Sequence, residues 1–185
     1  MKVFEKACPE NTDPTLKTAF EKAIELSTDV ILSTTGGVSA LRALELSKEM
    51  NFGGNIVVVS HVYGMRTPGE NTLSAEDRKT LEDAGVTVIT AAHTLSGVER
   101  AISGKFGGAY PVEIMAHTLR MISAGVKVCV EIGAMALDAG KAQYQRPVVT
   151  IGGTNRGLDT ACVLTPGYSS KIFETRVHEI LCKPY

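Results

Sequence analysis

Apolar residues recur along the chain with two periods, one typical of helices and one typical of buried strands. Leu16, Phe20 and Ile24 share one face of a predicted helix that Asp13 caps. Residues 29–34 follow as a short β-rich apolar run, which is typical of a buried parallel strand. Further helices are expected at about 38–50, 74–84, 96–104, 111–123 and 126–139, and further strands at about 55–60, 86–89, 147–151, 158–164 and 172–181.

Residues 126–139 fit both periods. Their valines alternate as in a strand, whereas Val128, Ile132 and Met135 fall on one helical face. A helix is favoured, because the apolar pattern continues for about four turns and Gly140 is suited to end it.

Two local patterns set the ends of other elements. Ser96 and Glu99 have the spacing of a capping box for a short helix. Residues 172–181 alternate, with Phe173 on one face and Glu174 on the other, which predicts an edge or antiparallel terminal strand.

The order of elements predicts the fold class. A strand at 29–34, a helix at 38–50 and a strand at 55–60 form a β-α-β unit, which implies a parallel pair with a right-handed crossover. We therefore expect one domain over 1–185, a three-layer α/β/α fold whose sheet is mostly parallel with an antiparallel terminal strand.

Composition and charge exclude several classes of protein. The 185 residues carry 19 Lys and Arg against 20 Asp and Glu, so no general nucleic-acid partner is expected. No run approaches the ~18 apolar residues of a membrane span, and the charged N-terminal segment is unlike a secretory signal. The four cysteines are widely spaced, which predicts reduced thiols, no metal site and a cytoplasmic protein. Self-association into a homo-oligomer is compatible with the sequence.

Three segments should meet at the carboxyl ends of the strands, where open α/β sheets bind ligands. Ser33–Ser39 joins a strand to a helix start with hydroxyls and two glycines, and this favours a phosphate or carboxylate. It matches neither a Walker A loop nor a G-x-G-x-x-G fingerprint, and the alternative is a tight turn with a hydroxyl cap. In the second segment, Ile151–Thr160, Arg156 suits an anion, whereas the alternative is a solvated loop.

The third segment is a long loop at 61–72. His61 stands at the strand end, and Tyr63, Met65 and Arg66 are placed to cover a planar ligand, although a loop without function is the alternative. No nucleophile motif or metal-ligand pattern accompanies these segments. The sequence therefore predicts a pocket and no evident catalytic group.

The segments just described, together with residues 131–140, carry a resemblance to a known family. Residues 30–40 resemble the strand, loop and helix of the pyruvate kinase C-terminal domain, whose loop grips the phosphate of a sugar effector. The whole chain more closely resembles the small stand-alone pyruvate kinase α/β-domain-like proteins. The resemblance implies the same fold but no pyruvate kinase activity, because the catalytic barrel is absent. The loop from His61 has no counterpart in the kinase domain, which argues against a sugar bisphosphate.

The stand-alone family is associated with bound flavin mononucleotide (FMN), so the resemblance implies FMN as cofactor. It implies a phosphate site in the loop that Ser33 opens, formed by Thr34, Thr35, Gly36, Gly37 and Ser39. It implies contacts to the ribityl chain and ring from His61, Gly64, Met65, Thr67, Gly153, Thr154, Arg156, Gly157 and Asp159. The residue pattern itself offers Tyr63, and Phe106 in the glycine-rich link at 105–110, as further walls of the pocket. Two functions compete, a module that binds or senses a phosphate-bearing small ligand and an FMN-dependent oxidoreductase with His61 as its first acid–base candidate. Binding is favoured.

Overall fold

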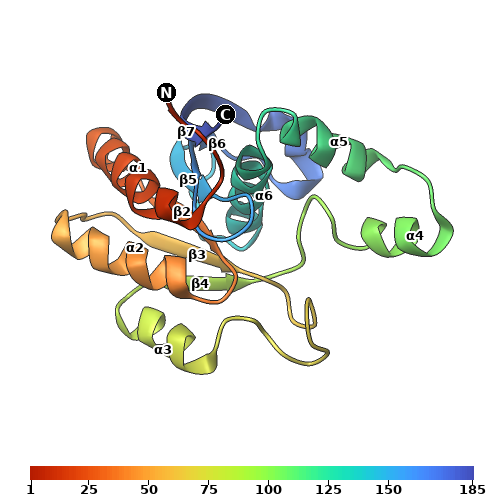
Figure 1. Cartoon of the computed structure of the whole chain (residues 1–185), viewed down its shortest axis with the longest axis horizontal. Helices are drawn as coiled ribbons and strands as arrows, with labels where there is room; N and C mark the ends of the chain where they lie inside the picture. Colours follow the sequence, from red (N-terminus) through yellow and green to blue (C-terminus); the bar gives the residue numbers. More distant parts are fainter.

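Seven strands form one sheet in the order β1-β7-β6-β5-β2-β3-β4 (Figure 1). The computed structural model describes residues 1–185. The strands are β1 (Lys2–Phe4), β2 (Val30–Thr34), β3 (Ile56–Ser60), β4 (Thr87–Thr90), β5 (Val148–Gly152), β6 (Thr160–Thr165) and β7 (Arg176–Pro184). The α-helices are α1 (Thr12–Leu26), α2 (Val38–Glu49), α3 (Ala75–Asp83), α4 (Glu99–Phe106), α5 (Pro111–Arg120) and α6 (Ala124–Asp138), and two 3-10 helices are η1 (Pro9–Asn11) and η2 (Ser169–Glu174).

The strand directions confirm the expected mixed sheet. Strands β5, β2, β3 and β4 are parallel, and β6 runs against them. The terminal strand β7 pairs antiparallel with β6, as its alternation predicted, and β1 pairs in parallel with β7. The sequence did not predict β1, because it is three residues long and buries only Phe4.

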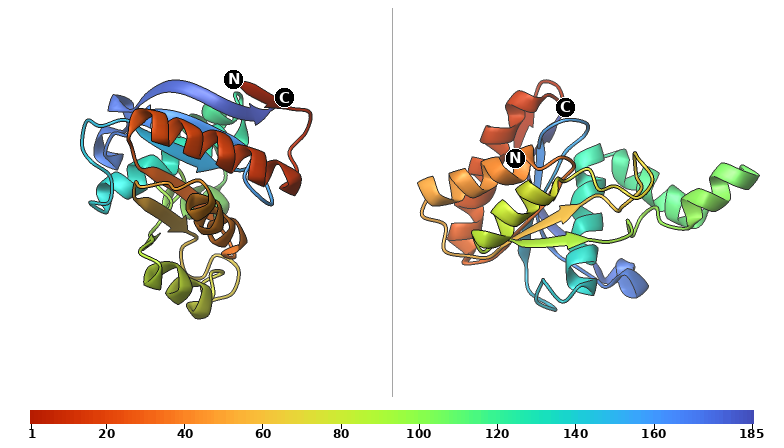
Figure 2. Two further views of the ribbon diagram at one scale, coloured as in Figure 1. Left: turned by 90° about the vertical axis from the view of Figure 1, so that its left-hand side faces the viewer. Right: turned by 90° about the horizontal axis from the view of Figure 1, so that it is seen from below.

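Two apolar cores, one on each face of the sheet, confirm the three-layer fold. Leu16, Phe20 and Leu81 belong to α1 and α3 and pack with Leu32 on one face. Ile31 faces the other way and packs in the core that α5 and α6 cover. Successive residues of a buried strand point to opposite faces, so β2 supplies both cores. Figure 2 shows α1, α2 and α3 on one side of the strands and α5 and α6 on the other.

Helix α4 lies apart from these layers. It has no buried residue and stands away from the sheet in Figures 1 and 2. The predicted capping box is wrong, since α4 begins at Glu99 with Val98 as its N-cap. The Glu99 carboxylate instead accepts a hydrogen bond of 2.8 Å from the backbone N–H of Glu113, at the start of α5. Glu99 therefore caps the next helix and joins α4 to α5.

Two other local predictions need correction. The predicted strand at 172–181 begins only at Arg176, because residues 169–174 form η2, where Arg176 Nη1 donates to the carbonyl of Phe173 and Gly167 N donates to Thr175 Oγ1. These short-range hydrogen bonds hold a turn. An alternation of apolar and polar residues over only four positions is compatible with such a turn as well as with a strand. The ambiguous residues 126–139 form a helix, as predicted.

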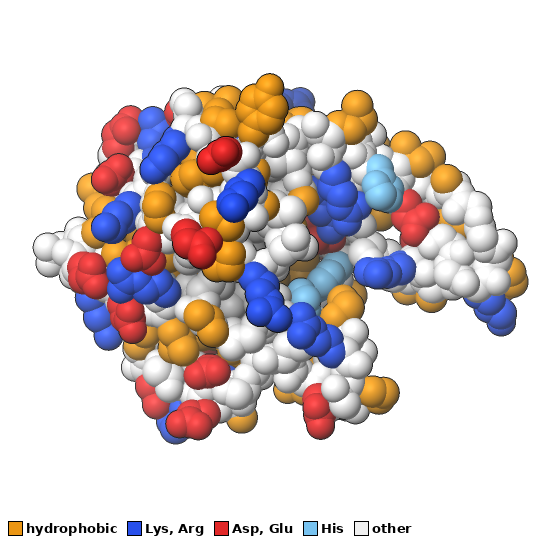
Figure 3. All heavy atoms as spheres, in the orientation of Figure 1, with side chains coloured by type: hydrophobic (Ala, Val, Ile, Leu, Met, Phe, Trp, Pro, Cys, Tyr) orange, Lys and Arg blue, Asp and Glu red, His pale blue; other side chains and the backbone are white.

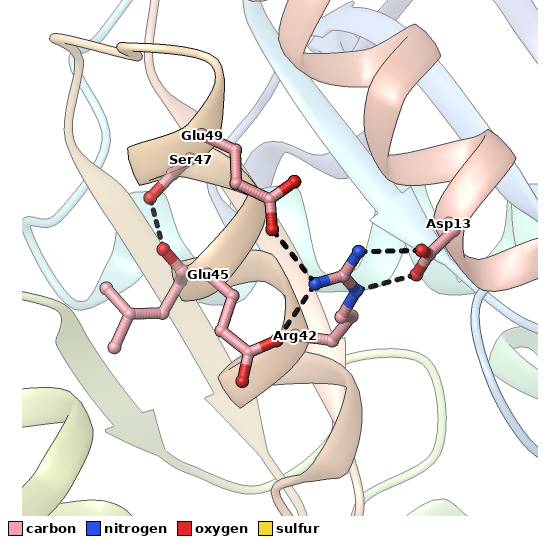
Figure 4. A network of polar contacts seen from close by, with 6 residues as sticks. Asp13, Arg42, Glu45, Ser47 and Glu49 are labelled. Atoms are coloured by element: carbon pink, nitrogen blue, oxygen red, sulfur yellow. Dashed lines mark hydrogen bonds and ion pairs between the residues drawn. The ribbon is translucent and has the colours of Figure 1, made fainter.

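The predicted N-cap Asp13 instead forms an ion pair with Arg42 (Figure 4). Two parallel hydrogen bonds of 2.9 and 2.8 Å join the guanidinium to both carboxylate oxygens, and they hold the pKa of Asp13 below its ordinary value. Arg42 also donates to Glu45 and Glu49 of its own helix. The network fixes the beginning of α1 against α2.

None of the helices combines the length and apolar character that crossing a bilayer would require.

Candidate functional site

The carboxyl ends of the parallel strands meet at one edge of the sheet. The register pairs Thr34 with Ser60 and Ser60 with Thr90, so β2, β3 and β4 end level with one another. Leu32 pairs with Ile151, which places the end of β5 beside the end of β2. The segments that follow these strands therefore begin along the same edge.

Hydrogen bonds join two of the three predicted segments. Thr35 Oγ1 lies 3.4 Å from His61 Nε2, and Thr72 Oγ1 donates to the carbonyl of Thr35 over 2.7 Å. Asn71 Nδ2 donates to the carbonyl of His61 over 2.8 Å. Both ends of the long loop at 61–72 are thus fixed beside the loop at 33–39.

Inside the loop at 33–39, the hydroxyls of Thr34 and Ser39 already make hydrogen bonds within the turn. Thr34 Oγ1 accepts a hydrogen bond of 3.2 Å from Gly37 N and lies 3.1 Å from Ser39 Oγ. Gly37 has a φ of +92°, a conformation that favours glycine, and it precedes the first residue of α2. Thr34 is buried, whereas Gly36 is exposed and Thr35 and Ser39 are half-buried.

A carboxylate approaches the start of α2. A Cβ atom on Gly37 would lie 3.1 Å from Asp77 Oδ2, so the side chain of Asp77 lies against the end of the helix that attracts negative charge. A phosphate bound to this loop would have to share the positive end of α2 with Asp77. The sequence analysis did not include this residue, which follows the loop by about 40 positions in the chain.

The remaining predicted segment, at 151–160, is organised by its own contacts. Asp159 is buried, and its two carboxylate oxygens accept hydrogen bonds from Thr154 N (3.0 Å) and Thr160 Oγ1 (2.8 Å). Gly157 has a φ of +80°, and a Cβ there would lie 2.5 Å from Thr12 Oγ1. These contacts explain Asp159 and Gly157 without a ligand.

The other predicted residues differ in how far they could serve a ligand. Gly153 packs on the backbone of Gly157, whereas Thr154 and Arg156 are exposed and remain predicted contacts. The exposed long loop holds Tyr63, Gly64, Met65 and Thr67, and Tyr63 lines a cavity of about 300 Å³ with Asn71 and Arg78. Phe106 ends α4, which projects from the body (Figure 1), and it is 71% exposed. The structure does not bring Phe106 to the loops.

Four ionisable side chains gather at this edge, and we call their site the histidine hollow. His61 and His93 follow β3 and β4, with ring centroids 5.4 Å apart. From α6 come Lys127 and Glu131, each with a side chain 6% exposed, and Lys127 Nζ lies 2.5 Å from Glu131 Oε2. Figure 3 shows histidine side chains in a hollow beside the projecting arm, with Lys and Arg side chains around it.

Burial favours the neutral form of both histidines. It lowers the pKa of His61 below 6.5, and the nearby His93 and Arg66 lower it further, whereas Glu131 opposes the change. Burial likewise lowers the pKa of His93, with Lys127 and Arg100 adding to the effect and Glu131 opposing it. The Nδ1 atom of His61 is buried without a hydrogen-bond partner.

Most of the charged side chains that act on the groups of the hollow are cationic. Burial also lowers the pKa of Lys127, Glu131 opposes this, and Arg120 and Arg100 are close enough to add to it. Glu131 is partly neutralised by Lys127 and is held by a hydrogen bond of 3.0 Å from Leu95 N to its Oε1. Such a hollow attracts anions, since clefts of one charge sign concentrate the opposite charge.

No sequence pattern marks Lys127, Glu131 or His93 as a site residue. Lys127 and Glu131 interrupt the apolar pattern of residues 126–139, and no metal-ligand pattern includes His93. The signal that could have found the pair is its spacing of four residues within an apolar helix, which places both charges on one buried face.

Another cavity lies at the opposite edge of the sheet. Its volume is about 620 Å³, and its lining includes Lys22, Arg146 and His178. Lys22 already pairs with Glu25 (3.0 Å) and Glu179 (3.3 Å). The histidine hollow is the better candidate despite this volume, because it combines buried ionisable groups with an unpartnered nitrogen, and such groups are typical of functional sites.

The fold and the site define an α/β protein with a positively charged hollow at the carboxyl edge of a mostly parallel sheet. No known protein-family model matches the chain.

Proposed function

We propose that this protein binds a phosphate-bearing small ligand at the carboxyl edge of its sheet and acts as a binding or sensing module. The observation that carries the proposal is the histidine hollow, in which buried Lys127 lies near His61 and His93. Three arginines, Arg66, Arg100 and Arg120, also act on these groups and outnumber the carboxylate of Glu131. A positive, partly desolvated hollow favours a phosphate over a neutral group of the same size.

FMN is the first candidate for the ligand. It carries one phosphate and one planar ring, and exposed Tyr63 and Met65 lie in the loop that begins at His61. The unpartnered Nδ1 of His61 and the half-buried hydroxyl of Thr35 are available to polar groups of such a ligand. The resemblance of residues 33–39 and 152–160 to the stand-alone pyruvate kinase-like proteins supports FMN over other phosphate esters.

Purified protein is expected to quench FMN fluorescence saturably and to bind riboflavin, which lacks the phosphate, more weakly. Arg100→Glu should weaken FMN binding on the order of tenfold, because it reverses a charge that acts on the hollow. Arg146→Glu makes the same change in the cavity at the opposite edge and should leave the affinity unchanged.

Three results would argue against this function. Without co-purified flavin or saturable quenching, FMN is the wrong ligand and phosphosugars should be screened. If riboflavin binds as tightly as FMN, or if Arg146→Glu weakens binding more than Arg100→Glu, the phosphate does not enter the histidine hollow.

An FMN-dependent oxidoreductase is the second candidate. It is favoured by the neutral His61 and His93 beside the buried Lys127–Glu131 pair, because titratable groups with shifted pKa values gather at catalytic sites. Bound flavin would supply the redox chemistry, and the histidines could donate or accept a proton. Consumption of NADH or NADPH by FMN-loaded protein at catalytic rates would favour this function, and its absence would favour binding alone.

A further inference from the structure

Lys127 has hydrogen-bonding capacity that the protein does not use. An ammonium group has three N–H donors, and Glu131 Oε2 is the one partner that Nζ has in the structure. A buried charge is costly unless it is paired and hydrogen-bonded, so the remaining donors favour a further acceptor in the hollow.

The histidine pair lies next to these free donors. His93 is close enough to Lys127 and Glu131 for both charges to act on it, and its ring lies 5.4 Å from that of His61. His61 Nδ1 has no partner, and Nε2 is 3.4 Å from the Thr35 hydroxyl. The pair can therefore offer ring nitrogens to an oxygen-rich group.

The balance of charge favours the hollow over the loop at 33–39 as the place where a phosphate binds. Glu131 is the single carboxylate that acts on the two histidines, against Lys127, Arg66 and Arg100. At the start of α2, by contrast, Asp77 already lies against the helix end.

We propose that the phosphate of the ligand is held in the histidine hollow by Lys127, His61 and His93, not by the loop that begins α2, and that its binding is coupled to the uptake of a proton by the histidine pair. The inference rests on the proposed function for the identity of the whole ligand.

Proton uptake follows from the sign of the charges. In the free protein, burial and the surrounding cations keep both histidines neutral above their lowered pKa values. A phosphate dianion adds negative charge, which favours the imidazolium form and raises the pKa of the pair. At pH values between the pKa of the pair in the free protein and its higher pKa in the complex, the bound state holds more protons than the free state. Two adjacent imidazolium ions repel each other, so one proton is taken up.

Nuclear magnetic resonance of labelled histidines tests this without FMN. The side-chain resonances of the four histidines are followed against pH in sodium chloride and in inorganic phosphate at matched ionic strength. Phosphate should raise the apparent pKa of the His61–His93 pair by about one unit and leave His178, at the opposite edge, unchanged. An unchanged pair, or an equal shift at His178, would overturn the proposal.

Variants locate the phosphate within the edge. The double variant Lys127→Met/Glu131→Gln removes both buried charges and should abolish the response to phosphate. Asp77→Asn at the start of α2 should preserve the response. The inference is wrong, and the loop holds the phosphate, if phosphate still shifts the histidine pKa fully in the folded double variant. The same conclusion follows if Asp77→Asn increases that shift by more than the double variant decreases it. If the double variant does not fold, the wild-type titration decides the matter.

The two proposals fail separately. If inorganic phosphate shifts the histidine pair but FMN does not bind, the subsite stands and the assigned ligand is wrong. If FMN binds, but phosphate shifts nothing and the folded double variant binds FMN undiminished, the ligand stands and the subsite is wrong.

Discussion

Lys127→Met is expected to lower the free energy of unfolding by about 3–5 kcal/mol at pH 7, because it leaves the buried Glu131 carboxylate without its counter-ion. Methionine preserves most of the length and apolar surface of the lysine side chain, so the loss reports mainly the broken ion pair. Urea unfolding followed by circular dichroism measures the change.

The double variant Lys127→Met/Glu131→Gln is the control for this prediction. Both buried charges are then absent, and the amide oxygen of Gln at position 131 can still accept the hydrogen bond from Leu95 N. The double variant should recover most of the lost stability, since replacing both members of a buried pair is far less costly than removing one. A double variant as unstable as Lys127→Met would mean that Lys127 stabilises the fold through packing, not through its charge.

Gly125→Ala should destabilise the protein by about 3 kcal/mol, because α6 approaches β6 too closely for a side chain at this position. An added Cβ would lie 2.1 Å from Thr160 Oγ1 and 2.4 Å from Thr160 Cβ, and Thr160 is fully buried. Relief requires α6 to move, and α6 carries Lys127 and Glu131. We therefore also expect weaker FMN binding, measured alongside thermal unfolding.

Gly104→Ala is the matched control, since Gly104 also lies within a helix but has no atom within 4 Å of an added Cβ. There the substitution should be neutral, or stabilising by up to about 1 kcal/mol, because alanine favours the helix. Equal effects of the two substitutions would contradict the close approach of α6 to β6.

Local patterns predicted most of the fold because its central elements are regular. The strands β2 and β3 follow from short continuous apolar runs, and the helices α2 and α6 follow from an apolar period of 3.6 residues. Long-range partners decided the elements that were mispredicted or missed. Three-residue β1 exists because it pairs with β7, and Glu99 caps α5 rather than its own helix.

The candidate site was predictable in its place but not in its chemistry. Parallel strands end together, so the neighbourhood of Thr35 and His61 follows from the order of strands and helices. The contact of His93 with His61, and the approach of Asp77 to Gly37, join residues about 30 to 40 positions apart, and no local pattern encodes such contacts. The Lys127–Glu131 pair was visible as a spacing, but only its burial shows that it belongs to the site.

The most direct test of the central claim is to map where FMN binds by following the backbone amide resonances of the labelled protein during a titration. We expect the largest shifts at His61 and at residues 93–95, and smaller ones at residues 33–39, all at the carboxyl edge of the sheet. Residues 141–146 and His178, around the cavity at the opposite edge, should not shift. Shifts that cluster around that cavity, or saturating FMN without any shift at the carboxyl edge, would contradict the claim.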